Sequence, residues 1–537
     1  MTFGMGSWAV MARNRCSGLI EHSSPIRRRN RRIPTFDPRR VGRIRYVSYA
    51  EPRMRSAWRP RQNSKGRPPA LMGADTEGFG TARRQLDLPR SIRVRRVELR
   101  EPVKLTSSGP RSDGRPGSSK QLVLLCEHFY PEMISTGMHM TELATRLAEL
   151  GWRITVYTAK PTWGTDGDEE RSVPKEMVHE GVRILRVPTI GRQKGKLLSR
   201  TVSSVTFVLS VSWALVRRRA DYRCMVITTN PPFIGALGWL YSRLFRRPYL
   251  LIVYDVFPDF AISLGVLSPD SWIAKAWERM TRMILAGAAV TVVIGRDMQD
   301  LVQRKMSPHL HDRIVMIPNW SDERRVHHVP AAANAFRQEH RLDGRFVVQY
   351  AGRLGQKHNL EPLIDAARLL SDTRALFQFV GDGDKKPKLE ALAADLGLEN
   401  VQFLPYQPME RLAEMLSAAD VAVVCLESGH TGISVPSKAY GVIASGTPIV
   451  GILDPDGEIG QMVKETGCGV LVDPVGEEIA AVIRDLMVDP VKRSAMSAAA
   501  RQIFLEKYTL SKAAEAYDAA LSSMLNGSPN GGERGIR

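Results

Sequence analysis

Cysteine is scarce in this chain, and its spacing excludes several classes of protein. The 537 residues contain five cysteines, none of them in a CxxC pair: Cys16, Cys126, Cys224, Cys425 and Cys468. A disulfide-stapled fold needs a high density of cysteines, and a cysteine zinc site is usually built from CxxC-type pairs, so neither is expected. Scattered thiols instead indicate a reducing compartment.

Long apolar runs are also lacking. No apolar core of signal-peptide length follows the first basic residues, so a secretory signal is not expected. The run Thr201–Val216 has sixteen uncharged residues between Arg200 and Arg217, fewer than the roughly twenty of a membrane-spanning helix. Two interpretations remain open for this run: a helix lying in or near a membrane interface, and a helix packed on a sheet.

Acidic residues are few in the first part of the chain, which accounts for most of the net charge of +20. Residues 1–120 carry 28 basic and 9 acidic side chains, a net charge of +19, whereas the remaining 417 residues carry 48 and 47, a net charge of +1. Nucleic-acid binding, which the total charge suggests, would therefore rest on a tail alone, and no nucleic-acid partner is expected.

Residues 1–119 are rich in Arg, Pro, Ser and Gly and show no apolar periodicity. Such a segment buries too little apolar surface to offset its ordering entropy, so we expect a mostly disordered basic tail. Three interpretations remain open: a solvated tail, a basic arm for anionic lipid or nucleic acid, and a gene start placed too far upstream.

From Gln121 onward the pattern becomes α/β, because short apolar runs alternate with amphipathic segments such as Thr141–Leu150, a predicted helix. This alternation indicates βαβ units and a parallel sheet in a first domain, residues 120–327. Its predicted strands are 121–126, 153–157, 182–187, 225–228, 249–253, 290–294 and 314–317.

After a polar connection the alternation restarts, so we expect a second doubly wound domain over residues 328–508. Its predicted strands are 346–350, 376–380, 401–404, 421–425, 449–452 and 469–472. The predicted helices are 360–370, 386–396, 479–487, 491–504 and 511–525. In two such domains, ligands are expected at the carboxyl ends of the strands, in a cleft between the domains.

The stretch Gly429–Pro448 is the first candidate for binding an anion. It is a loop of small residues that is expected to enter a helix at Val435-Pro436-Ser437, with Ser434 as the cap. Free N–H groups at a helix start and the adjacent Lys438 would attract a phosphate. A plain turn between a strand and a helix remains the alternative.

The stretch Gly352–Asn359 is the second candidate, and it lies between a predicted strand and a predicted helix. Arg353 offers a forked guanidinium and Lys357 a point charge, so the two side chains together could grip a pyrophosphate. A solvated basic turn is the alternative. Two loops of this kind in one domain favour phosphate binding.

These motifs, taken in order, resemble the GT-B glycosyltransferases of the family-4 type. The resemblance is strongest to the bacterial subgroup that builds exopolysaccharide, O-antigen or colanic-acid-like chains. The residues that carry it are Phe129–Glu132, Gly137–His139, Tyr254–Asp259, Pro318–Trp320, Gly352–Gly355, Val380–Gly383, Val435–Gly441 and Ala444–Pro448.

The resemblance implies an α/β fold of two Rossmann-like domains and retaining transfer of a sugar, usually from a UDP-sugar, to a hydroxyl acceptor. It implies no essential metal and no other cofactor. The donor would bind the second domain and the acceptor the first. The last helix, 509–525, would cross back to the first domain, ahead of a flexible tail over 526–537. The candidate donor-binding residues are Arg353, Lys357, His358, Gly432, Ile433, Ser434, Lys438 and Glu458.

The chain departs from the family pattern at two places. The family often carries two glutamates eight residues apart, and the corresponding positions here are Ile433 and Gly441. Glu458, at a predicted helix start, is our substitute, and a plain helix-start acid is the alternative. The phosphate lysine usually stands five residues after the arginine, where this chain has His358; we favour Lys357 as the ligand.

Candidates for the chemistry itself lie in the first domain. Gly137 is expected at a phosphate-facing helix start, and His139 beside it would contact the transferred sugar or the acceptor; a surface histidine is the alternative. Asp255 follows a predicted strand and could orient or deprotonate an acceptor hydroxyl, or act as a structural cap. Asp-x-Asp triplets at 166–168, 382–384 and 454–456 could hold a metal, but the resemblance does not require one.

We therefore predict a glycosyltransferase of cell-surface polysaccharide synthesis that acts on a glycan or lipid-linked acceptor. We expect it in the cytoplasm, attached peripherally to the anionic inner face of the cytoplasmic membrane. The alternatives are another GT-B enzyme, such as a nucleotide-sugar epimerase, and a nucleic-acid-binding protein that acts through the basic tail.

Overall fold

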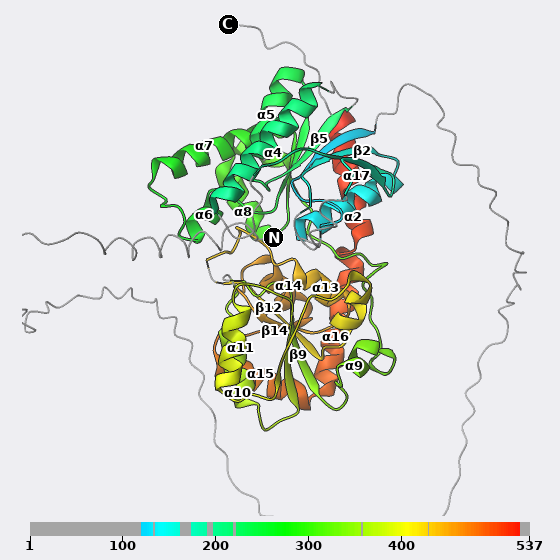
Figure 1. Cartoon of the computed structure of the whole chain (residues 1–537), viewed down its shortest axis with the longest axis vertical. Helices are drawn as coiled ribbons and strands as arrows, with labels where there is room; N and C mark the ends of the chain where they lie inside the picture. Colours follow the sequence, from blue (N-terminus) through cyan, green and yellow to red (C-terminus); the bar gives the residue numbers. More distant parts are fainter. Residues whose placement is uncertain are drawn as a thin grey trace, which may run out of the picture. The chain divides into compact units, whose positions relative to one another are not determined.

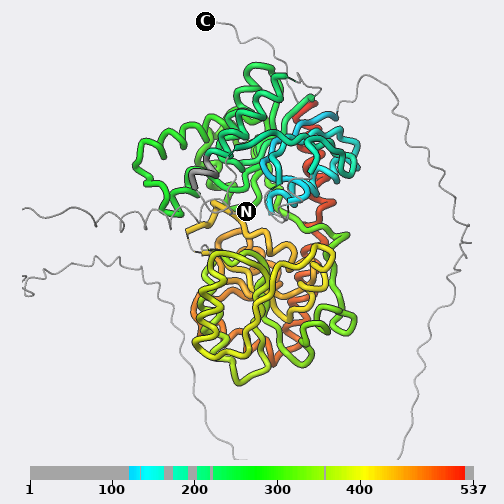
Figure 2. Tube along the Cα trace, in the orientation of Figure 1, coloured from blue at the N-terminus to red at the C-terminus, as the bar shows by residue number. Residues whose placement is uncertain are grey.

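The structure is a computed structural model, shown in Figures 1 and 2. It describes residues 120–132, 135–161, 173–190, 197–217, 222–355, 358–427 and 429–526, without the side chains of 197–201. The predicted tails, residues 1–119 and those beyond Asn526, lie outside the described residues.

Eight strands form the first sheet, in the order β3-β4-β2-β1-β5-β6-β7-β8. All neighbouring pairs are parallel except β3 and β4, which form an antiparallel edge. The chain builds one side of the sheet from β1 and then returns to start the other side at β5, so the switch point lies between these two strands. The strands are β1 (Gln121–Leu125), β2 (Arg153–Thr158), β3 (Glu176–His179), β4 (Val182–Arg186), β5 (Cys224–Thr228), β6 (Tyr249–Val253), β7 (Val290–Val293) and β8 (Ile314–Met316).

Helices cover this sheet, and strands β5 and β6 are therefore buried along their whole length. The helices are α2 (Ser135–Glu149), α4 (Leu197–Arg217), α5 (Ile234–Phe245), α6 (Asp259–Ser263), α7 (Trp272–Gly287), α8 (Arg296–Lys305) and the 3₁₀ helix η1 (Pro308–Arg313). Among the described residues, no helix combines the length and apolar character that crossing a bilayer requires.

Helix α2 begins at Ser135, six residues before the predicted start at Thr141, so that prediction was wrong. Hydrophobic periodicity placed Gly137 in a loop, whereas the family resemblance placed it at a helix start. In the structure this glycine lies inside the first turn, where an added Cβ would lie 3.3 Å from the backbone oxygen of Glu132. The glycine therefore allows the helix to pack closely on the loop before it, and it does not end the helix.

Six parallel strands form the second sheet, in the order β11-β10-β9-β12-β13-β14. Strands β9 and β12 are neighbours at its switch point. The strands are β9 (Phe346–Ala351), β10 (Ala375–Val380), β11 (Val401–Leu404), β12 (Val421–Cys425), β13 (Ile449–Ile452) and β14 (Gly469–Leu471). The prediction of two doubly wound α/β domains is confirmed.

The helices that follow β9 include all five predicted ones, with bounds that differ by a few residues. They are α10 (Glu361–Leu369), α11 (Lys386–Asp395), α12 (Leu412–Ser417), α13 (Lys438–Ala444), α14 (Glu458–Thr466), α15 (Gly476–Val488), α16 (Pro490–Lys507) and α17 (Leu510–Asn526). Helix α9 (Ala335–Glu339) and the 3₁₀ helices η2 (Ala331–Ala333) and η3 (Met409–Arg411) lie in connections.

The last helix, α17, packs beside α2 of the first domain, where Figure 1 shows the two ribbons together. Asp518 of α17 accepts hydrogen bonds from Lys120 Nζ at 2.8 Å and from Trp152 Nε1 at 2.6 Å. The chain therefore leaves the second sheet after α16 and returns to the first.

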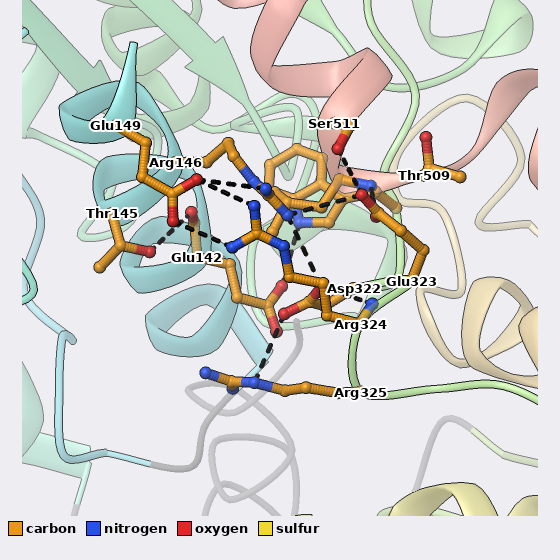
Figure 3. Close-up of polar contacts among 12 residues, drawn as sticks. Glu142, Thr145, Arg146, Glu149, Asp322, Glu323, Arg324, Arg325, Thr509 and Ser511 are labelled. Atoms are coloured by element: carbon orange, nitrogen blue, oxygen red, sulfur yellow. Dashed lines mark hydrogen bonds and ion pairs between the residues drawn. The ribbon is translucent and has the colours of Figure 1, made fainter. Parts of the chain in front are cut away.

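A polar network holds the point where the chain passes between the two sheets (Figure 3). Ser321 and Thr509 form a backbone bridge, and Glu323 accepts the Leu510 N–H at 2.9 Å. From α2, Arg146 lies 3.5 Å from Glu323. These contacts hold the two segments that connect the sheets, around Ser321 and Thr509, to each other and to α2.

Candidate active site

The two predicted phosphate loops leave the second sheet side by side. One follows β9 and the other follows β12, and these strands are hydrogen-bonded neighbours through Val348 and Val421. Their carboxyl ends meet at the switch point, which is where doubly wound sheets bind ligands. The sequence motifs that lie about eighty residues apart along the chain therefore form one site.

Lys438 links the two loops. Its Nζ donates to the Tyr350 Oη at 2.5 Å and lies 4.0 Å from the centre of the Tyr350 ring. A Cβ on Gly352 would lie 3.5 Å from the same Nζ. Burial lowers the pKa of Lys438 to about 8. The lysine remains mostly charged at neutral pH and points at the loop that carries Arg353.

Arg353 is held in place by an aspartate. Its Nη2 donates to Asp384 Oδ2 at 2.9 Å, and its backbone oxygen accepts from Tyr350 Oη at 2.7 Å. The turn that carries Asp384 contains Gly383, whose φ is +156° and where a Cβ would lie 2.3 Å from the Leu354 oxygen. The glycine-rich motif after β10 therefore packs against the arginine loop and aims its guanidinium.

The loop after β9 carries two further predicted phosphate ligands, Lys357 and His358. Lys357 lies outside the described residues. His358 is partly buried, and its ring meets that of Tyr350 edge-on at 5.9 Å. The sequence interpretation missed Lys385, whose Nζ donates to the His358 backbone oxygen at 2.8 Å and to Glu361 at 2.9 Å.

The predicted start of the helix after β12 was wrong. Helix α13 begins at Lys438, and no side chain caps it. Ser434 is buried and lies four residues before the helix, where the N-cap position is Ser437, so Ser434 does not act as the cap. Pro436 lies two residues before the helix and not in its first turn. With a helix of seven residues, the side-chain charge of Lys438 contributes more to an anion site than the helix dipole does.

The loop before α13 contacts the first domain at two points. The Ile433 oxygen accepts the Val256 N–H at 3.1 Å, and the Ser437 Oγ lies 3.0 Å from the Ser135 Oγ at the start of α2. These contacts bring the segments that carry both first-domain candidates, His139 and Asp255, to the donor-side loop.

His139 lies one turn into α2 and is buried against the edge of Trp320, with ring centres 5.1 Å apart. Its Nδ1 hydrogen-bonds the Ser135 oxygen at 2.7 Å. Burial lowers the pKa of His139 to about 4, against the opposing effect of the Ser135 and Trp320 backbones. The ring is therefore neutral at pH 7, and within the described residues its buried Nε2 has no hydrogen-bond partner.

Asp255 follows β6 and is also buried. Its backbone N–H donates to Thr229 Oγ1 at 3.2 Å, on the loop that follows the switch-point strand β5. The carboxylate therefore lies at the carboxyl edge of the first sheet, next to the residue that contacts Ile433.

Glu458 has its own partner in the first domain. It is 2% exposed, and its Oε2 accepts from the Arg296 N–H at 2.9 Å and from Arg296 Nε at 3.0 Å. Gly432 donates its N–H to Asp297 Oδ2 at 2.8 Å. The sequence could not show these pairs because the partners lie more than a hundred residues apart.

The described Asp-x-Asp triplets are engaged in other contacts. Asp384 pairs with Arg353, and Asp454 accepts from Thr431 Oγ1 at 2.5 Å. The triplet 166–168 lies outside the described residues. Among the residues that the structure describes, no three His, Cys, Asp or Glu side chains gather as metal ligands.

Comparison with known proteins agrees with this arrangement. The family model for a glycosyl transferase 4-like domain matches residues 136–320, and the model for glycosyl transferases group 1 matches residues 332–503. The two matches follow one another along the chain and correspond to its two sheets.

Two curated bacterial proteins are similar over most of their length. The probable glycosyltransferase WbjE of Pseudomonas aeruginosa is 29% identical over 62% of this chain and 82% of its own. The putative colanic acid biosynthesis glycosyl transferase WcaI of Escherichia coli is 28% identical over 68% of this chain and 91% of its own.

Solved structures share the fold. Sucrose-phosphate synthase from Thermosynechococcus elongatus has a TM-score of 0.62 at 18% identity, over 76% of this chain and all of that one. WaaG, a glycosyltransferase involved in lipopolysaccharide biosynthesis, has a TM-score of 0.57 at 17% identity, with the same coverage. At such identities the likeness concerns the fold alone. The two family matches and the two curated relatives, with this shared fold, establish that this chain is an enzyme of the GT-B glycosyltransferases, family-4 type, as found in bacterial polysaccharide synthesis.

Proposed function

We propose that the enzyme transfers a sugar, with retention of anomeric configuration, from a UDP-sugar to a hydroxyl group of a lipid-linked glycan. The observation that carries this proposal is the convergence of Arg353 and Lys438 at the switch point of the second sheet. Two cations on facing loops suit a diphosphate, which carries two adjacent negative groups. The Anabaena protein HepE, which shares the fold, binds UDP and glucose, which supports a uridine donor.

The cations would act mainly on the leaving group. Negative charge grows on the departing diphosphate as the glycosidic bond breaks, so Arg353, Lys438 and Lys357 would stabilise the transition state more than the bound donor. Asp384 contributes by fixing the Arg353 fork before the donor arrives.

Two first-domain side chains complete the proposed site. The neutral His139 ring, with Nδ1 engaged by Ser135, leaves Nε2 as an acceptor for a hydroxyl of the transferred sugar. Asp255 lies where a carboxylate could orient the acceptor hydroxyl. Both act without any bound metal in this proposal.

A donor screen tests the proposal. Released nucleotide is measured for a panel of UDP- and GDP-sugars, with and without lipid-linked acceptors. We expect release that depends on the acceptor and appears with a UDP-sugar. Interconversion of a UDP-sugar without acceptor would favour an epimerase, and a salt-sensitive gel shift without any turnover would favour nucleic-acid binding.

A lipid-linked acceptor is supported by the outer face of helix α4. Phe207, Val211 and Leu215 are buried against the sheet, whereas Leu209 is 64% and Trp213 66% exposed. The exposed apolar side chains recur every three or four residues and form one stripe: Val202, Val205, Leu209, Trp213 and Val216. A soluble helix seldom leaves such a stripe uncovered.

The stretch of sequence that contains this stripe is strongly basic. Residues 181–254 contain 13 basic residues and one acidic residue, Asp221, a net charge of +12, although residues 121–537 as a whole carry +1. A two-fold interface pairs each patch with itself. Self-association through the stripe would therefore place two basic segments against each other, and their like charges would repel. An anionic membrane surface instead attracts the basic residues, by about 1 kcal/mol each near the surface.

A further inference from the structure

Helices α8 and α14 belong to different sheets, yet their N-termini meet. Helix α8 begins at Arg296 after β7, and α14 begins at Glu458 after β13. Glu458 accepts two hydrogen bonds from Arg296, one from the backbone N–H and one from Nε. The next residue of α8, Asp297, accepts from the Gly432 N–H at 2.8 Å, on the loop before α13, and from the Met298 N–H at 2.9 Å.

Helix α8 is therefore capped by the first-turn acid of α14, and the first-turn acid of α8 holds the loop before α13. Both helices have glycine at their own cap position, Gly295 and Gly457, and neither glycine supplies a side-chain cap. Two helix N-termini that face each other carry like partial charges, so their approach is unfavourable unless anions lie between them. Asp297 and Glu458 supply those anions and at the same time accept hydrogen bonds from the Met298 and Arg296 N–H groups at the start of α8.

The contact is closely packed. A Cβ on Gly295 would lie 3.0 Å from the Cβ of Glu458 and 3.0 Å from a methyl of Val435. Gly432 has a φ of +73°, and a Cβ there would lie 2.8 Å from the Asp297 oxygen. The remaining cavity among these groups is about 20 Å³, which is room for one water molecule. A side chain larger than hydrogen at either glycine would separate the two segments.

This contact also fixes the loop that leads to Lys438. Gly432 is held by Asp297, and the next residue, Ile433, is held by Val256 of the first domain. The loop between β12 and α13 is thus anchored on first-domain atoms six residues before the lysine that contacts Tyr350. A loop that is ordered in advance loses less entropy when it binds a ligand.

We propose that Arg296, Asp297 and Glu458 form a clasp that positions the donor loop, so that the affinity for the nucleotide diphosphate depends on first-domain residues that do not touch it. In this proposal Glu458 acts through Arg296 and does not contact the sugar or the ribose. Arg296 and Asp297 are positioning residues. The inference rests on the proposed function, because it presumes that the loop binds a nucleotide-sugar.

The experiment measures UDP binding by calorimetry for the full-length wild type and for Arg296→Ala, Asp297→Ala, Glu458→Ala and the double variant Arg296→Ala/Glu458→Ala. We expect each single change to weaken binding about tenfold, and the double change to weaken it by less than the two single losses multiplied together, because Arg296 Nε and Glu458 form one interaction while the backbone N–H of residue 296 remains in every variant. In turnover assays the loss should lie in KM for the donor, with kcat close to wild type.

Val302→Ala is the matched control. Val302 is fully buried in α8, so its truncation lowers the melting temperature without touching the clasp. We expect it to leave UDP affinity unchanged, which separates positioning from general destabilisation.

Three results would overturn the clasp. The first is wild-type affinity in both Arg296→Ala and Asp297→Ala. The second is a full further loss from Glu458→Ala in the Arg296→Ala background, which would make Glu458 a direct donor ligand. The third is a parallel loss in Val302→Ala. Absence of UDP and GDP binding in the wild type would overturn the proposed function itself, and the clasp's role with it.

Discussion

At the scale of single residues, the site depends on cations whose positions are set by neutral or acidic partners. Tyr350 contacts Lys438 through its hydroxyl and its ring face, and the same hydroxyl donates to the Arg353 backbone. Asp384 then fixes the guanidinium. The charge that a diphosphate would meet is therefore oriented before binding, which is the condition for strong electrostatic stabilisation.

Arg353→Ala should lower kcat/KM for the donor about a hundredfold or more, the loss typical of removing one group that stabilises transition-state charge. Steady-state kinetics with the donor from the screen measure this. Asp384→Asn, which keeps the arginine but loosens its support, should give a smaller loss. Wild-type kinetics for both Arg353→Ala and Lys357→Ala would refute the assignment of the phosphate site.

Lys438 should impose a pH dependence on donor affinity. Because burial lowers the pKa of Lys438 to about 8, the free enzyme loses this charge as the pH rises above that value. A diphosphate binds the charged form, so UDP affinity should be constant near pH 7 and fall about tenfold per pH unit above pH 8. Calorimetry at several pH values tests this, and Lys438→Ala should bind weakly without the decline. An identical decline in that variant would assign the titration to another group.

The loops of this site were predictable from the sequence, but their supporting residues were not. Basic residues after a strand, framed by glycines, predict an anion loop at Arg353. Tyr350 looks like an ordinary strand residue, and Asp297 lies 135 residues from its partner Gly432. A contact of that kind depends on how two separate sheets meet, which no local pattern encodes.

At the scale of elements, α4 shows why an apolar run can be ambiguous. Both of its faces are apolar, so hydrophobic periodicity cannot show which one packs on the sheet. The structure separates them, with Phe207 fully buried and Leu209 largely exposed.

This separation gives a test of membrane binding. Leu209→Asp/Trp213→Asp should reduce flotation with anionic liposomes severalfold while the protein stays folded, because both side chains are exposed. Phe207→Asp should instead unfold the first domain, since it buries an unpaired charge. Circular dichroism distinguishes the two effects.

The control for this test is Val491→Asp, at a 78% exposed apolar position on α16 of the second domain, which should float like wild type. The assay is run on the full chain and on a chain starting at Ser118, because the basic tail could itself bind lipid. Equal flotation of the α4 double variant and the control would refute the membrane proposal and leave the glycosyltransferase assignment standing.

At the scale of the whole molecule, the alternation of strands and helices was enough to predict two doubly wound domains. It did not predict the antiparallel edge strand β3, whose residues alternate between exposed and half-buried and form too short a run. The packing of α17 on the first domain was predicted from the family resemblance alone. No local pattern could predict it, because its hydrogen bonds, such as that between Lys120 and Asp518, join the two ends of the described chain.

A chain starting at Ser118 should fold and keep its transfer activity, because residues 1–119 contribute no predicted core. It retains Lys120, which pairs with Asp518. Thermal melting and the transfer assay compare it with the full chain. Insoluble or inactive protein from the shorter chain, beside an active full-length protein, would make the tail an integral part of the enzyme.

The central claim is sugar transfer with retention from a nucleotide-sugar held by the second domain. The most direct test follows one reaction by NMR, with the donor from the screen and a lipid-linked acceptor, and determines the anomeric configuration of the new bond. The account predicts one transferred sugar per released nucleotide, linked in the donor's own anomeric configuration, with the yield abolished in Arg353→Ala/Lys438→Ala. An inverted linkage, or a donor altered without transfer, would contradict it.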